Sequence, residues 1–419
     1  TVRRWPRSEI RRGVSLLRAL RVLTKTYFFV DLERFAWGGA YGINLAERVG
    51  EPGELAQLQA AYGMIMNGLG NRRAAARYLD AARKLASENR SRHPLGEGLV
   101  LQLNGTLHMF WDDPEAGLAD LDESIRICRS AGGMWELLTS LGTQGQLLFL
   151  LSRFEESAEK YTECGELARE LNSTVHMGWK HCKASFCRYL IGEPAPELRA
   201  TVREELFQAI ALSIQAEDLM NHLIATAHLA VIARHEGDAA EAARLAVEIL
   251  EINRRYKVNV PHVKISLVAE SYTTLFAADT LESGQNRDGA GSIGLSRGEL
   301  LKIAATAIYK ARALGKTFPY LRGPAERARA RYIQLTKGDD AAWPFFERAM
   351  QLLDQTPHLW ERGQAYAAAA DTLSEQDPRR SQLLTRAAEI FRSANIQAEL
   401  AQLPAAYRSQ QATVVAATE

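Results

Sequence analysis

The sequence has few cysteines, no long hydrophobic run and almost no net charge. Its four cysteines lie between Cys128 and Cys187, which argues against a disulfide framework and favours a reducing compartment, the cytoplasm. No stretch of about 18 consecutive apolar residues occurs, so we expect no transmembrane segment. The formal net charge of +1 lacks the strongly basic character typical of nucleic-acid-binding domains, so we expect no nucleic acid among the partners.

Signals for β-strands are also missing. Alanine, leucine, glutamate and arginine dominate, with short breaks at glycine, proline or asparagine, so we expect an all-α chain. Helices are predicted at residues 10–26, 31–48, 54–68, 71–89, 95–110, 114–131, 135–150, 154–171, 175–191, 197–216, 219–235, 238–256, 261–281, 298–314, 319–336, 340–354, 358–374 and 379–393. The glycine-rich polar stretch 283–298 predicts a flexible insertion, and the residues after Pro404 are expected to fray.

Small residues recur in the middle of predicted helices, at intervals of 39 to 45 residues. These anchor residues are Gly63, Gly105, Gly145, Ser185, Ala230 and Ala269. In the best four examples a turn residue follows at +7 and small or apolar residues follow at +12, +16 and +19: Gly63, Gly70, Ala75, Leu79, Ala82; Gly105, Asp112, Gly117, Leu121, Ser124; Gly145, Ser152, Ser157, Tyr161, Cys164; Ala230, Gly237, Ala242, Ala246, Ile249. A small residue lets a partner helix cross closely, and a single hairpin does not bury its apolar face. The pattern therefore predicts stacked helical hairpins.

These offsets resemble the tetratricopeptide repeat, whose unit of about 34 residues is shorter than the spacing found here. The resemblance implies a right-handed superhelical solenoid of antiparallel helix pairs, with about 8–9 repeats in a single domain over residues 1–419. Within it we expect N-terminal capping helices at 1–50, main repeats at 51–282, the insertion at 283–298, C-terminal repeats at 299–403 and a tail at 404–419.

Two stretches carry a second resemblance. Residues 35–86, with an alanine-rich helix ending in Glu-Arg-Val-Gly, and residues 387–403 are similar to the superhelical arm of bacterial signal-transduction (STAND-type) ATPases. Those ATPases are attached to adenylate cyclases, protein kinases or transcriptional regulators, and the arm senses and docks while the nucleotide site lies upstream. The resemblance implies a scaffold or sensor arm of a larger signalling assembly, neither an enzyme nor a holder of a cofactor.

Motifs that carry chemistry are incomplete in this sequence. The glycines of segment 289–294 have dinucleotide-fingerprint spacing, but a helix precedes them where the mechanism needs a strand. The Gly-Lys-Thr at 315–317 imitates the end of a phosphate loop, yet Lys310 stands where the loop needs glycine. One helix likewise does not bring the soft ligands His176, His181, Cys182 and Cys187 to one metal ion.

The first 25 residues are basic, with eight basic side chains and one acidic one. The arginines that lead the segment are Arg3, Arg4, Arg7, Arg11 and Arg12, and its apolar stripe is Ile10, Val14, Leu17 and Leu20. One interpretation is an amphipathic helix that contacts an anionic lipid surface or an acidic protein. The other is a helix that caps the solenoid with its apolar stripe and exposes the arginines.

The concave side of such a solenoid is the expected functional surface, because the first helix of each pair lines it. Positions one, four and five after each anchor supply the candidate partner-binding residues, together with Trp179: Met64, Asn67, Met109, Phe110, Gln146, Phe149, Trp179, Phe186, Tyr189, Arg234 and His235. Methionine and aromatic side chains favour an adaptable apolar lining for a peptide or a partner helix. The simpler interpretation is that these side chains pack against the neighbouring repeat.

Two functional hypotheses follow. In the first, the groove binds a protein segment and the chain is a non-catalytic scaffold. In the second, Trp179, Phe186 and His235 line a pocket for a small molecule that regulates an attached ATPase or cyclase.

Overall fold

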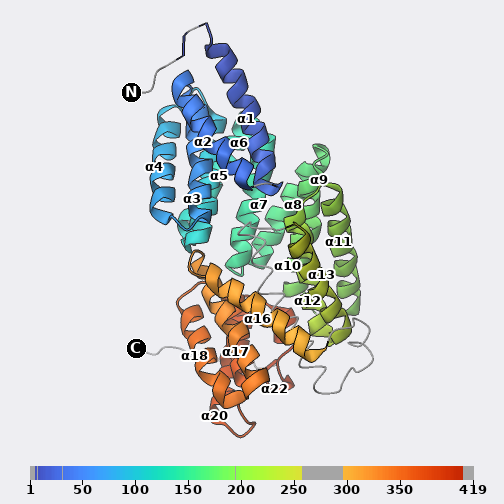
Figure 1. The fold of residues 1–419 in the computed structure, drawn as a ribbon. Helices are drawn as coiled ribbons and strands as arrows, with labels where there is room; N and C mark the ends of the chain where they lie inside the picture. The colour runs from blue at the N-terminus through green and yellow to red at the C-terminus, as the bar shows by residue number, and fades with distance from the viewer. Residues whose placement is uncertain (1–4, 7, 31, 194, 257–295, 409–419) are drawn as a thin grey trace, which may run out of the picture.

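Every regular element of this computed structural model is a helix within the part of the chain that it describes, namely residues 5–408 without 7, 31, 194 and 257–295 (Figure 1). The first half contains α1 (Ile10–Val30), α2 (Leu32–Val49), α3 (Pro52–Gly68), α4 (Arg72–Glu88), α5 (Pro94–Trp111), α6 (Pro114–Ala131), α7 (Met134–Leu150) and α8 (Phe154–Glu170). These helices pack as antiparallel pairs, α1 with α2, α3 with α4, α5 with α6 and α7 with α8. The expectation of an all-α helical-repeat solenoid is confirmed.

The second half continues the pattern. It contains α9 (Thr174–Trp179), a π-helical turn (Lys180–Ala184), α10 (Ser185–Ile191), α11 (Pro196–Gln215), α12 (Leu219–Glu236), α13 (Ala239–Tyr256), α16 (Arg297–Leu314), a 3-10 turn (Pro319–Leu321), α17 (Arg322–Lys337), α18 (Asp339–Asp354), α19 (Leu359–Ala370), α20 (Pro378–Ser393), α21 (Gln397–Leu400) and α22 (Ala405–Arg408). The predicted helix at 175–191 is a single rod interrupted by the π-helical turn. The predicted helix at 261–281 lies outside the described residues.

Two predicted irregular segments need correction. Residues 283–295 of the predicted insertion lie outside the described residues, but Ser296 caps α16 and the helix starts at Arg297, so 296–298 are not loop. Ser296 and Glu299 form a reciprocal capping box, a local start signal that the insertion prediction overlooked. The predicted frayed tail likewise contains the short helix α22, whose Tyr407 donates from its hydroxyl to Ser381 at 3.1 Å.

The anchor glycines stand where paired helices cross closely. A Cβ atom on Gly105 would lie 2.6 Å from the Leu121 side chain, and one on Gly145 would lie 2.8 Å from the Tyr161 ring. The predicted +7 turn residues Gly70, Asp112, Ser152 and Gly237 all have positive φ, between 61° and 79°. This left-handed conformation ends the first helix and reverses the chain into the second.

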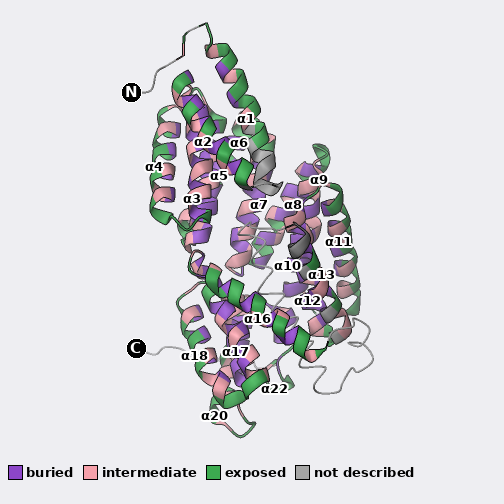
Figure 2. Cartoon of the chain, viewed as in Figure 1, coloured by how far each residue is buried: buried purple, intermediate pink, exposed green. Residues whose placement is uncertain are grey.

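The residues predicted at +12, +16 and +19 form the interior of each pair. Ala75, Leu121, Tyr161 and Ile249 are all buried at these positions. Polar members of the series bond across the pair, since Ser157 donates to the carbonyl oxygen of Gly145 at 2.8 Å. Figure 2 shows the result, with buried residues along α5 inside the molecule and exposed residues along the outer helix α4.

The N-terminal helix caps the solenoid. Leu17 of α1 is fully buried in a cluster with Leu45 and Val49 of α2, and Val14 packs against it. Arg11 and Arg12 are exposed on the other side of α1. Arg3, Arg4 and Arg7 lie outside the described residues. The capping interpretation therefore holds for α1, and the exposed arginines are compatible with an anionic contact.

The C-terminal helices return to the middle of the chain. His358, which precedes α19, lies with its Nδ1 2.8 Å from the carbonyl oxygen of Leu150 and its Nε2 3.0 Å from Asp112 Oδ1. The backbone N–H of Trp360 donates to Ser152 Oγ at 2.8 Å. These contacts join segments more than 200 residues apart, so the C-terminal repeats cover the turns that end α5 and α7.

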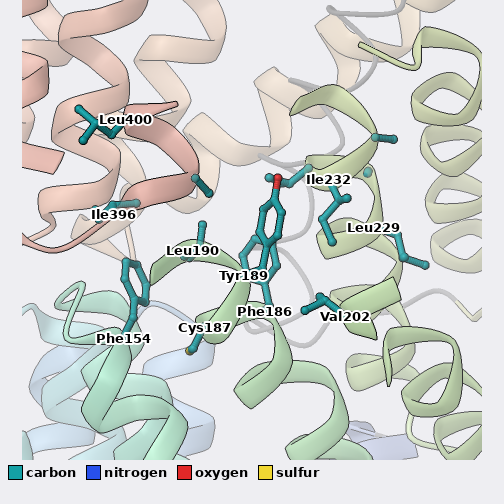
Figure 3. Packing of buried hydrophobic residues seen from close by; sticks show 14 of the residues in the cluster. Phe154, Phe186, Cys187, Tyr189, Leu190, Val202, Leu229, Ile232, Ile396 and Leu400 are labelled. Atoms are coloured by element: carbon teal, nitrogen blue, oxygen red, sulfur yellow. The ribbon is translucent and has the colours of Figure 1, made fainter. Parts of the chain in front are cut away.

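A shared hydrophobic core fills this junction (Figure 3). Ile396 and Leu400, at and after the start of α21, lie in the same buried cluster as Phe154 of α8 and Leu190 of α10. No helix within the described ranges is long and apolar enough to cross a bilayer.

Replacing Gly105 by alanine is expected to lower the free energy of unfolding by about 1–2 kcal/mol, because overpacking costs more than the gain in helix propensity. The added methyl group would lie 2.6 Å from Leu121 and 3.0 Å from the carbonyl oxygen of Gly117. Gly68→Ala is the control, since nothing lies within 4 Å of its added Cβ, and it should stabilise or leave the protein unchanged. Urea unfolding followed by circular dichroism measures both. Equal stabilisation by the two variants would contradict the close crossing.

Replacing His358 by leucine is expected to lower the free energy of unfolding by about 2 kcal/mol, because Asp112 and the carbonyl of Leu150 lose a buried partner. The control is Glu155→Gln, at an exposed contact with Asn395 across the same junction, which should stay within about 0.5 kcal/mol of the wild type. Urea unfolding again measures the effect. A His358→Leu protein as stable as the control would show that the junction does not depend on this histidine.

Candidate functional site

The concave side of the solenoid holds a cavity of about 250 Å³, which we call the concave cavity. The first helices α3, α5, α7, α9 and α12 and the π-helical turn of successive pairs supply most of its walls. Its apolar lining includes Leu58, Met64, Leu99, Leu103, Met109, Phe149, Val175, Trp179, Met220 and Ile224. A mostly apolar cavity with a few polar groups is the usual form of a small-molecule site.

The lining follows a register that differs from the predicted one. Residues six positions before an anchor (Gln57, Leu99, Thr139, Trp179, Ile224) and two positions before it (Ala61, Leu103, Thr143, Lys183, His228) all line the concave cavity. These offsets are one helical turn apart and therefore share a face. The predicted offsets +1, +4 and +5 lie partly on this face and partly on the face that packs inside the molecule.

Five of the candidate partner-binding residues line the concave cavity: Met64, Met109, Gln146, Phe149 and Trp179. Asn67 instead is buried and accepts a hydrogen bond from Trp111 Nε1 at 2.8 Å. Phe110 packs edge-on against Phe318 of the C-terminal half, with ring centroids 5.2 Å apart. Neither side chain therefore faces an open groove.

Phe186 and Tyr189 are also interior residues. Phe186 stacks on His228 with ring centroids 3.8 Å apart, and the Tyr189 hydroxyl lies 2.9 Å from His235 Nδ1. Both belong to the core shared with the C-terminal helices (Figure 3). The proposed trio Trp179, Phe186 and His235 is thus separated, because only Trp179 reaches the concave cavity. The sequence offsets from the anchor residues did not predict that the C-terminal helices cover this part of the concave side.

Arg234 lines a second, smaller cavity of about 140 Å³ under the C-terminal helices, which we call the C-terminal cavity. Its walls include Tyr320, Arg327, His358, Glu361 and Gln364. Phe149, Ile224 and His228 line both cavities and stand between them. Occupation of one cavity therefore touches side chains that also shape the other.

A buried carboxylate, that of Glu399, is hydrogen-bonded where the C-terminal helices pack against the middle of the chain. The Glu399 carboxylate accepts from Trp360 Nε1 at 2.7 Å and from the Gln364 amide, and it lies 3.5 Å from His235 Nε2. Burial alone would raise the pKa of Glu399, but His235, Arg234 and the Trp360 donor outweigh it and lower the pKa to about 2. The carboxylate is therefore charged and held inside the protein.

Amides and hydroxyls form the polar part of the concave cavity. Gln57, Gln102 and Gln146 come from α3, α5 and α7. The Gln102 amide donates to the hydroxyls of Thr106 at 3.2 Å and Thr143 at 3.3 Å. Successive first helices thus present one glutamine each to the cavity.

Lys183 is the feature that the sequence interpretation missed. It sits in the π-helical turn, a local widening that often occurs at functional sites, and its side chain is only 7% exposed. Its Nζ donates to Gln146 Oε1 at 2.7 Å and lies 5.2 Å from the centre of the Tyr161 ring. Burial lowers the pKa of Lys183. The signal was present, because Lys183 stands two positions before anchor Ser185, on the cavity-facing register.

Aromatic rings surround this lysine. Trp179 lies 5.8 Å from Nζ and fits against the bare backbone of Gly142, where a Cβ would come within 2.5 Å of its ring. His176 packs against Trp179 with ring centroids 4.7 Å apart. Its Nδ1 lies 2.8 Å from Ser173 Oγ, and its Nε2 has no hydrogen-bond partner among the described residues.

The cysteine thiols near the cavity are unsuited to nucleophilic chemistry. Burial raises the pKa of Cys164 and of Cys187 to about 12, so both thiols stay protonated. Cys182 is also fully buried, and burial raises its pKa further.

No model of a known protein family matches this chain, and no curated protein matches it either.

The stability of the protein is expected to fall as the pH drops below about 6.5, because burial lowers the pKa of His176 to about 4 and that of His228 to about 3. The unfolded chain takes up protons at these histidines near pH 6.5, whereas the folded protein does not until the pH reaches these lower values. The two histidines therefore contribute fully to the free energy of unfolding above about pH 6.5. As the pH falls toward 3–4 this contribution is lost, at about 1.4 kcal/mol per pH unit for each histidine. Urea unfolding at several pH values measures the slope. A His176→Gln variant with the wild-type slope would refute the assignment.

Proposed function

We propose that this chain is a non-catalytic sensor arm that binds a small ligand in the concave cavity and belongs to a larger regulatory assembly. The observation that carries the proposal is the cavity itself, about 250 Å³ of mostly apolar space bounded by the first helices of successive pairs. A ligand there would contact α3, α5, α7 and α12 together, so its binding energy would act on the stacking of several repeats at once.

The position of the cavity suggests how occupancy would be communicated. Phe149, Ile224 and His228 border both cavities, and the C-terminal cavity includes His358, which joins the two halves of the chain. A ligand that displaces these shared side chains would favour one packing of the C-terminal repeats over another. That is the requirement for a sensor, because a ligand shifts an equilibrium only by its differential affinity for two states.

A second candidate function is capture of a partner segment in the same place. The specific support is the series Gln57, Gln102 and Gln146, since amides at regular spacing suit the backbone groups of an extended peptide. Phe110, Phe186 and Tyr189 are covered by the chain's own C-terminal helices, which leaves less open apolar surface than a peptide groove needs. The small-ligand function is therefore the one we prefer.

The larger assembly is proposed from the resemblance of residues 35–86 and 387–403 to the arms of signal-transduction ATPases. In such an arrangement an attached ATPase, cyclase or kinase would receive the change in superhelix packing. Arg11 and Arg12, exposed on the capping helix α1, offer a contact for an acidic surface of that assembly.

A neutral fluorescent probe, N-phenyl-1-naphthylamine, tests the small-ligand function. We expect its fluorescence to rise on binding to the full chain and the rise to be lost in Thr139→Phe, because Thr139 lines the concave cavity and a phenyl ring would fill it. Thr201→Phe is the matched control. Thr201 is exposed on α11, and its hydroxyl, like that of Thr139, donates to the carbonyl four residues earlier. Equal titrations for the two variants would contradict the proposal.

A further inference from the structure

One buried amino group, that of Lys183, sets the chemistry of the concave cavity. Lysine is almost never fully buried unless it is paired, because removing an ammonium from water is costly. Lys183 is 7% exposed, and its one hydrogen bond to a described residue goes to the neutral amide oxygen of Gln146. Two of its three N–H groups are left for another acceptor.

No carboxylate among the described residues pairs with this ammonium within the 4.0 Å of a salt bridge. The carboxylate of Asp218, whose charge acts on Lys183, already accepts hydrogen bonds from Trp179 Nε1 at 2.9 Å and from the backbone N–H of Asn221 at 3.1 Å. The rings of Tyr161 and Trp179 solvate the charge without neutralising it. Among the described residues, therefore, no carboxylate in contact with Lys183 competes with a ligand for its N–H groups.

The other residues that line the cavity favour a ligand with an apolar body. Met109, Phe149 and Val175 give the cavity apolar walls. Glu136, which also lines it, stands ten residues from Gln146 on α7, about 15 Å along the helix axis, and places a negative group toward the other end. A single amino group matches one negative charge better than a dianion such as a phosphate monoester, which carries about −1.5 to −2 charges.

We infer that the ligand of the concave cavity is a monocarboxylate with an apolar body, whose carboxylate group accepts hydrogen bonds from Lys183. The Gln146 amide nitrogen, which donates to no described group, is a second donor beside it. This inference rests on the proposed function and names the class of its ligand.

Calorimetric titration of the full chain with octanoate, octanol and octylamine tests the inference. We expect octanoate to bind at least about tenfold more tightly than octanol, as a charge-assisted hydrogen bond predicts, and octylamine to bind most weakly. In Lys183→Met the affinity for octanoate should fall about tenfold while that for octanol is kept. Lys180→Met is the control on the same π-helical turn, because Lys180 does not line the cavity, and it should bind octanoate like the wild type.

A second variant guards against a folding defect in Lys183→Met. Gln146→Glu places a carboxylate beside the ammonium and should compete with the ligand, so octanoate affinity should fall about tenfold in a protein whose circular dichroism is unchanged. Equal affinity of the wild type for octanoate and octanol, with Lys183→Met unaltered, would overturn the inference and leave the cavity function standing. If none of the three compounds and not even the neutral probe binds, the proposed function falls with it.

Discussion

Close crossing of paired helices is the constraint on which this structure depends. At Gly105 and Gly145 there is no room for even a Cβ atom without moving Leu121 or the Tyr161 ring. The small residue of the first helix faces a larger side chain of the second helix of the same pair, and each pair buries its remaining apolar surface against the next pair. The stack of pairs, its turns with positive φ and its concave side all follow from this packing.

The stack does not stay open along its length. Through His358, Trp360, the α21 N-cap Ile396 and the α21 residue Leu400, the C-terminal helices cover part of the concave side. The same junction buries the charged Glu399 among hydrogen-bond donors. A buried charge tolerates little displacement, because its partners must remain within hydrogen-bond distance. These contacts therefore fix the position of the C-terminal helices against the middle of the chain. The concave cavity is the part of the concave side that these helices do not cover.

Within that cavity, burial rather than residue type decides the chemistry. Histidines that line it and cysteines of the neighbouring core are common candidates for catalysis or metal binding, yet burial keeps His176 and His228 neutral and the thiols of Cys164 and Cys187 protonated. Lysine, which is ordinarily a surface residue, becomes the distinctive group because Lys183 is enclosed by Tyr161 and Trp179. The ligand class that we infer depends on this lysine.

The sequence by itself determined the helices, the pairing and the turns, because these depend on contacts between residues fewer than 20 positions apart, such as Gly105 with Leu121. Met64, Met109 and Trp179, which it assigned to the concave side, line the cavity. Only the tertiary structure decided that Phe110 and Tyr189 are covered and that Lys183 faces a cavity. Contacts such as those of His358 with Leu150 and Asp112 join residues more than 200 positions apart, and no local pattern encodes them.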